Sequence, residues 1–159
     1  MSKLSHLDEK GKARMVDVTV KEPTKREALA RGKVLMHRDT MALVAEGGIP
    51  KGDVFGVARI AGIMAAKKTS DMIPLCHPLE LTDIDVQFNM NVEAGEIIIE
   101  ARVKTFGRTG VEMEAMTAVS VAALTIYDMC KAAEKNIILS DIKLISKEGG
   151  KSGSFIRKE

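Results

Sequence analysis

The chain has few of the residues that mark several large classes of protein. It contains no Trp, one Tyr and four Phe among 159 residues, so it lacks the aromatic platforms on which single-stranded nucleic acid stacks. Its two cysteines, Cys76 and Cys130, are too few for a disulfide framework or a four-cysteine zinc site. The core must therefore consist of aliphatic residues, and we expect both thiols to be reduced.

The chain also lacks an excess of one charge and a long uncharged apolar run. Its 24 basic and 22 acidic residues give a formal net charge of +2, which favours neither nucleic acid nor an anionic membrane as a partner. No segment reads as a membrane span, and Asp8 and Glu9 precede any apolar run, unlike in a secretory signal. We expect a cytoplasmic protein without nucleic-acid or membrane partners, with residues 1–159 as one domain.

Hydrophobic periodicity predicts an α+β order of elements. We expect strands at 33–37, 84–92, 97–104 and 137–145, and helices at 39–45, from the N-cap Asp53 to 67–70, and at 112–131. This order, strand-helix-strand-strand-helix-strand, is that of a split βαβ, ferredoxin-like antiparallel sheet with helices packed on it. Residues 1–30 are predicted to be an extended N-terminal arm, and 148–159 a flexible basic tail.

The long helix is the most informative segment. Thirteen uncharged residues, 115–127, separate Glu114 from Asp128 and Lys131, and on a 3.6-residue period these three ionisable residues share a stripe that is otherwise apolar. Asp128 and Lys131 are three apart, so they could form an ordinary surface ion pair or act as general acid and base. The helix has more apolar circumference than one sheet can cover, which predicts self-association.

Two further motifs could carry chemistry. Cys76 and His77 lie between Pro74 and Pro78. Because adjacent side chains point in different directions, a hydrogen-bonding or proton-donating His77 is favoured over a Cys–His nucleophile, and zinc lacks further ligands. Lys51 precedes a helix N-terminus, where it is either an anion hook or a solvated loop lysine.

The C-terminal segment carries the last candidate cluster. Lys147 and Lys151 lie among Gly149, Gly150 and Gly153. These glycines and ammonium groups either wrap a phosphate chain or form a frayed polar terminus.

These motifs together resemble one enzyme family over nearly the whole chain. The most specific segments are 51–55, KGDVF; 58–63, ARIAGI; 73–79, IPLCHPL; and 109–115, TGVEMEA, running on to 124–132, LTIYDMCKA. They resemble the MoaC family, the cyclic pyranopterin monophosphate synthases of molybdenum cofactor biosynthesis.

The resemblance implies a subunit, an assembly and a reaction. It implies a ferredoxin-like subunit in a homo-hexamer, a trimer of dimers with each active site at a dimer interface. The reaction converts (8S)-3′,8-cyclo-7,8-dihydroguanosine 5′-triphosphate into cyclic pyranopterin monophosphate with release of pyrophosphate. It needs no redox cofactor, and Mg²⁺ is a plausible partner of the triphosphate.

The same resemblance implies roles for individual residues. It makes Asp128 and Lys131 the acid/base pair and Lys51 a further catalytic lysine. Lys147, with Arg26 and Lys151, would hold the triphosphate, and no residue is assigned to a metal. The base and sugar pocket would be lined by Leu75, Cys76, His77, Glu112, Met113 and Glu114.

Two other classes of function are compatible with parts of this pattern. A ferredoxin-like nucleotide or RNA binder would need aromatic residues on its sheet, for which Phe88 and Phe106 are too few. An oligomeric scaffold would use Asp128 and Lys131 as an interface ion pair, and Asp128→Ala would then weaken assembly.

Overall fold

A five-stranded antiparallel sheet with helices on one face makes up the fold. The structure, a computed structural model, describes residues 6–158. The strand order is β2-β3-β1-β4-β5, and each pair of neighbours is antiparallel. The strands are β1 (Thr24–Leu35), β2 (Leu81–Asn91), β3 (Glu96–Gly107), β4 (Ile138–Glu148) and β5 (Phe155–Ile156).

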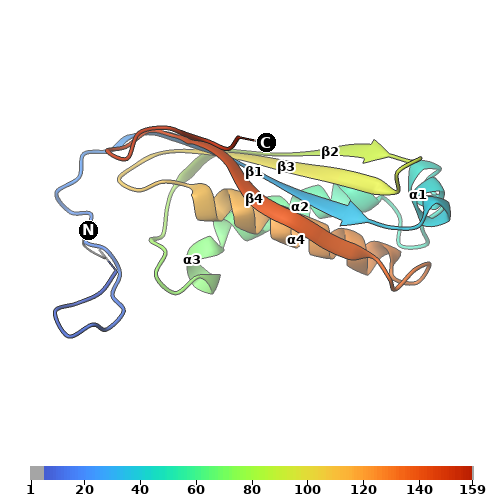
Figure 1. Cartoon of the computed structure of the whole chain (residues 1–159), viewed down its shortest axis with the longest axis horizontal. Helices are drawn as coiled ribbons and strands as arrows, with labels where there is room; N and C mark the ends of the chain where they lie inside the picture. The colour runs from blue at the N-terminus through green and yellow to red at the C-terminus, as the bar shows by residue number, and fades with distance from the viewer. Residues whose placement is uncertain (1–5, 159) are drawn as a thin grey trace.

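The two long helices lie side by side along the sheet, while the opposite face of the sheet has no helix (Figure 1). They are α2 (Val54–Lys67) and α4 (Glu112–Cys130); the shorter ones are α1 (Arg38–Ala45) and α3 (Thr69–Met72). Asp53 caps α2, because its carboxylate accepts a hydrogen bond from the Gly56 amide at 2.9 Å. The capping role predicted for Asp53 is confirmed.

Small residues let α4 pack closely on the central strand. Ala28, Ala30, Gly32 and Val34 form the buried side of β1. In the middle of α4 the buried positions are equally small, namely Ala115, Ala118, Val119, Ala122 and Ala123, and larger buried residues lie toward its ends. Close packing of the two elements fixes both ends of α4 relative to the strands.

The first strand is longer than predicted. It begins at Thr24 rather than at residue 33, so the predicted arm is wrong for residues 24–30. Alanine and glycine on the buried face give a weak apolar signal, and charged residues occupy the other face. Those charges are paired across the sheet: Arg31 with Glu100 at 2.8 Å and Lys33 with Glu96 at 3.0 Å.

The other predicted elements are confirmed, with small shifts in their boundaries. One strand was missed, β5, which pairs with β4 inside the predicted tail. Its two residues are too short a run to give a periodic signal.

Among residues 6–158 one helix, α4, is long and apolar enough to cross a bilayer by length and composition. Half of that apolar window is buried inside the protein, and α4 contacts β1, β3, β4 and α2. We therefore interpret α4 as a core helix.

The close packing at Gly32 yields a test. A Cβ atom there would lie 2.6 Å from Val119 Cγ1 and 3.1 Å from Ile142 Cγ1, so Gly32→Ala should lower the free energy of unfolding by about 1–3 kcal/mol through overpacking. Gly107→Ala is the matched strand control, because its Cβ atom would meet its nearest neighbour at 3.5 Å. Urea denaturation of both variants measures the difference, and equal stabilities would contradict the packing argument.

Candidate functional site

One pocket collects all six residues predicted to line the base and sugar site. Its volume is about 420 Å³, within the usual range for small-molecule sites. The segment after α3 supplies Leu75, Cys76 and His77, and the start of α4 supplies Glu112, Met113 and Glu114. The N-terminal segment adds His6, Val16, Val18 and Lys21.

The N-terminal segment fixes the protonation pattern of His77. The Nε2 atom of His77 lies 2.7 Å from the Val16 carbonyl oxygen. A carbonyl oxygen only accepts hydrogen bonds, so Nε2 must carry the proton and donate it. Nδ1 is then the ring nitrogen that can take up a proton, which fits the predicted proton-handling role of His77.

Glu114 is the one buried acidic or basic side chain in the part of the chain that the structure describes, with 4% of its surface exposed. Burial raises its pKa to about 7, and the nearby charge of Glu112 adds to the shift, while a backbone hydrogen bond opposes it. The carboxyl group is therefore divided between its neutral and ionised forms at neutral pH, so it can donate or accept a proton there.

The surroundings of Cys76 disfavour its ionised, nucleophilic form. Its partial burial raises the pKa of the thiol, and the charge of Glu114 raises it further. Since the thiolate is the nucleophilic form, the structure supports the hydrogen-bonding interpretation of the Cys76–His77 motif.

A smaller polar pocket, which we call the basic pocket after its three cations, continues from this one. It has a volume of about 180 Å³, and the cations Lys21, Arg26 and Lys147 line it beside the carboxylates of Glu27, Glu112 and Glu148, together with Gly149 and Ser152. Both pockets share Lys21, Thr109, Gly110 and Glu112, so they form one groove. We call it the composite groove.

Arg26 and Lys147 are each held in the basic pocket by contacts with residues of other segments. Arg26 Nε donates to the Gly107 carbonyl oxygen at 3.2 Å. Lys147 Nζ lies 3.7 Å from the Glu112 carboxylate and also contacts the Ser152 hydroxyl. Lys151, also predicted to hold the triphosphate, is exposed and lines neither part of the composite groove.

The three predicted catalytic residues form a second cluster, which we call the lysine–aspartate triad. Lys51 Nζ lies 2.7 Å from Asp128 Oδ2, and Lys131 Nζ lies 2.7 Å from Asp128 Oδ1. Lys51 also donates to the Asp128 carbonyl oxygen at 3.0 Å. An ammonium group at the last turn of α4 complements the helix dipole.

The charges of the triad fix its protonation. Hydrogen bonds from Lys131 and then Lys51 lower the pKa of Asp128 to about 2, and Asp128 in turn raises the pKa of Lys131. At neutral pH Asp128 is therefore an acceptor and Lys131 a proton donor. All three side chains are about half exposed, so the triad is open to a ligand.

The triad and the composite groove lie at opposite ends of α4. Glu114 and Asp128 are fourteen residues apart on this helix, which corresponds to about 21 Å at a rise of 1.5 Å per residue. A single chain therefore does not bring the predicted catalytic residues to the predicted substrate pocket.

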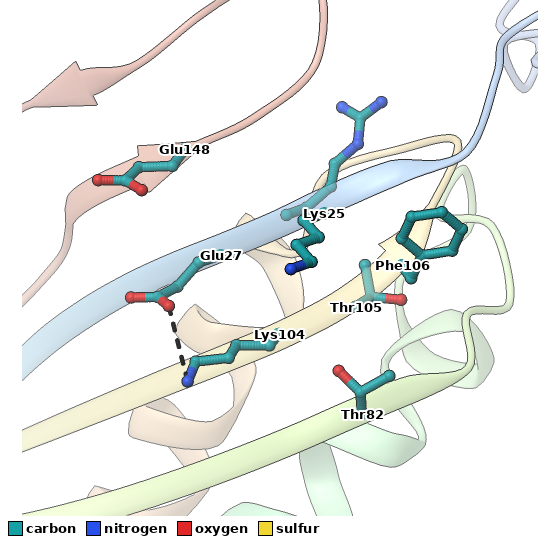
Figure 2. Close-up of a pocket in the computed structure, with 8 residues that line it drawn as sticks. Lys25, Glu27, Thr82, Lys104, Thr105, Phe106 and Glu148 are labelled. Carbon is teal, nitrogen blue, oxygen red and sulfur yellow. Dashed lines mark ion pairs between the residues drawn. The ribbon is translucent and has the colours of Figure 1, made fainter.

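A third hollow, of about 530 Å³, lies on the helix-free face of the sheet. Figure 2 shows Lys25, Glu27 and Lys104 around it, with Phe106 at one end. Glu27 pairs with Lys104 at 3.8 Å and also with Arg102. Of the predicted site residues only Arg26 lines it, and we do not assign the active site here.

Sequence reasoning missed Lys21, which lines both parts of the composite groove. It lies in a segment without periodicity or a motif, so only its spatial position identifies it. In the described residues, no group of three or more His, Cys, Asp or Glu side chains is placed to hold a metal ion.

The fold and the groove define an α+β protein with a polar groove of small-molecule size, in which cations and carboxyl groups lie close together. Residues 15–150 match the model of the MoaC family. The chain belongs to the MoaC family.

Curated relatives in this comparison are similar over their full length. One from Heliobacterium modesticaldum is 65% identical over 159 residues, with 100% of both chains covered. One from Pelotomaculum thermopropionicum is 62% identical, covering 99% of this chain and 93% of its own length. One from Thermoanaerobacter pseudethanolicus is 57% identical, covering 98% of each. All three are named cyclic pyranopterin monophosphate synthase.

The raised pKa of Glu114 leads to a prediction about stability. Between the ordinary pKa of 4.5 and about 7, the unfolded chain loses the Glu114 proton while the folded chain keeps it. The unfolded state then binds fewer protons, so this group makes wild type less stable as pH rises through that window. The variant Glu114→Gln lacks this titrating group. Its free energy of unfolding should therefore rise relative to that of wild type as pH goes from 4.5 to 7.5, by a few kcal/mol at most.

Thermal unfolding across this pH range measures the Glu114 effect. Glu46→Gln, at an exposed position after α1, is the control and should track wild type. A constant difference between Glu114→Gln and wild type at every pH would show that Glu114 titrates as an ordinary carboxyl group.

Proposed function

We propose that this chain is a cyclic pyranopterin monophosphate synthase and that the composite groove binds its substrate, the cyclised dihydroguanosine triphosphate. The observation that carries the proposal is that one continuous groove holds Lys21, Arg26 and Lys147 toward one end and the buried carboxyl group of Glu114 toward the other. The guanine edge presents N–H donors, which suit carboxylates, and phosphates suit lysine and arginine. The proposed reaction type is that of a phosphorus–oxygen lyase.

The residues provide the chemistry that the reaction demands. Purine ring opening and pterin closure need proton transfers, for which His77 Nδ1, Glu114 and the Asp128–Lys131 pair are suited by their protonation. In the last step a ribose oxygen attacks the α-phosphorus and the bond from that phosphorus to the bridging oxygen breaks, releasing pyrophosphate. Ammonium and guanidinium groups stabilise the negative charge that develops on the leaving group.

We further propose that each active site is completed by a second copy of the chain. The separation of about 21 Å along α4 supports this, because it is too long for one substrate molecule to reach both clusters of one chain. A two-fold axis across the middle of α4 would place the partner's lysine–aspartate triad beside the composite groove. The same operation creates a second, equivalent site.

An apolar stripe on α2 supports the helix layer as the contact face. Val57, Ile60 and Met64 recur at helical spacing and are 44%, 59% and 53% exposed, and Leu124 on α4 is 58% exposed. Exposed large aliphatic side chains at this density indicate an interaction surface. The predicted surplus of apolar helix surface is thus present on α2 as well as on α4.

The remaining parts of the proposal concern architecture and surroundings. The order β4-β1-β3-β2 within the sheet supports a ferredoxin-like subunit, and we propose a cytoplasmic homo-hexamer built from dimers. Since no protein metal cluster is apparent among residues 6–158, we propose that any Mg²⁺ enters on the triphosphate oxygens. The chemistry itself requires no redox cofactor.

The function is tested with the purified protein and the cyclised triphosphate. Wild type should release pyrophosphate and form a pterin that becomes fluorescent on oxidation. Lys51→Ala should lose at least roughly a hundredfold in turnover, the usual effect of removing a general acid or base. The matched control is Lys67→Ala, because Lys67 is exposed at the end of α2 and should turn over normally. A well-folded wild type without turnover would refute the assignment.

Mixing two inactive variants tests whether the site is shared. His77→Ala damages the composite groove and Lys51→Ala the triad, so a hybrid dimer has one doubly damaged site and one intact site. After subunit exchange at equal amounts, about a quarter of wild-type activity should return, because half of the dimers are hybrids. If each site belonged to one chain, the mixture would remain inactive.

A further inference from the structure

The segment after β4 folds back over the start of β1. Gly149 and Gly150 adopt φ angles of +95° and +79°, which residues with a side chain rarely adopt. A Cβ atom at Gly149 would lie 2.3 Å from the Lys25 carbonyl oxygen. The two glycines therefore allow both the turn and the close approach to β1.

Gly150 is in close contact with a functional side chain. A Cβ atom there would lie 2.1 Å from Arg26 Nη1 and 2.8 Å from Arg26 Cζ. The guanidinium group thus occupies the space that any side chain at position 150 would need. Its Nε atom is bound on another side by the Gly107 carbonyl oxygen at 3.2 Å.

Arg26 and Lys147 both line the basic pocket. Arg26 lies against Gly150 on one wall, and Lys147 enters from the end of β4. The carboxylate of Glu112 lies 3.7 Å from Lys147, and Glu27 and Glu148 also line the pocket, so an anion that binds here must compete with these carboxylates for the cations. Correct placement of Arg26 is then important, because a planar guanidinium group can form two parallel hydrogen bonds with one phosphate.

We propose that Gly150 is a positioning residue for polyphosphate binding. Because Gly150 has no side chain, the guanidinium group of Arg26 can occupy the adjacent space, and from there it binds the phosphate chain. The identity of the ligand as the substrate triphosphate rests on the proposed function. The contact between Gly150 and Arg26 does not rest on it.

The chain offers a matched control. Gly153 has a φ angle of +67°, and a Cβ atom there would meet no atom within 4 Å. Gly150→Ala and Gly153→Ala therefore introduce similar backbone strain, but only the first obstructs Arg26. Gly150→Asn and Gly153→Asn form a second pair with less strain, because asparagine tolerates the left-handed region. This pair serves if the alanine variants fold poorly.

Two measurements test the proposal. Calorimetric titration with inorganic tripolyphosphate needs no turnover, and steady-state kinetics with the cyclised triphosphate give KM and kcat. The Gly150 variants should raise both the tripolyphosphate Kd and the KM by about 10–100-fold, as expected for loss of a charge-assisted interaction, with kcat changed by less than about threefold. The Gly153 variants should match wild type.

A double-variant comparison tests whether Gly150 acts through Arg26. If it does, the double variant Arg26→Ala/Gly150→Ala should bind tripolyphosphate with a Kd less than about twofold above that of Arg26→Ala alone. Additive losses, or equal losses in the Gly150 and Gly153 variants, would overturn the proposal. If the tripolyphosphate results hold but wild type has no turnover, the proposed function fails and the positioning role stands.

Discussion

Close packing of α4 against β1 is the constraint on which the rest of the structure depends. Val119 of the helix lies against Gly32 of the strand, and most of the buried side chains beside them are alanine, so the two elements approach more closely than larger side chains would allow. The helix is thereby held along its whole length against the sheet. The polar groups at its two ends, Glu112 and Glu114 at the start and Asp128 and Lys131 at the end, are therefore held at a fixed separation.

The two ends of this rigid helix hold carboxyl groups in different surroundings. The N-terminal end of α4 carries a carboxyl group buried deeply enough to be partly neutral at pH 7. Its C-terminal end carries an exposed carboxylate kept ionised by two ammonium groups. Carboxyl groups with such different affinities for protons are what a reaction with several proton transfers requires. Their separation along one helix favours assembly of the site from two chains.

Much of this could be read from the sequence, and the parts that could not have physical causes. The long helices and the hairpin have strong periodic signals, and Asp128 and Lys131 form the pair that their spacing allows, whereas the contact of Lys51 with Asp128 was not predicted. The first half of β1 was missed because its buried residues are alanine and glycine, which any element can contain. Lys21 was missed because it reaches the composite groove from an irregular segment, and Lys151 lies outside the groove although it is close in sequence to Lys147.

The contact between Val16 and His77 has a consequence for variation among relatives. The bond that orients the imidazole is accepted by a main-chain oxygen, and every residue type has that oxygen. The identity of residue 16 can therefore drift without loss of the contact, whereas a change in the length of the chain between residue 16 and β1 would break it. The contact with His77 therefore depends on the spacing of the chain, and only the place of Val16 in the lining of the composite groove restricts its side chain.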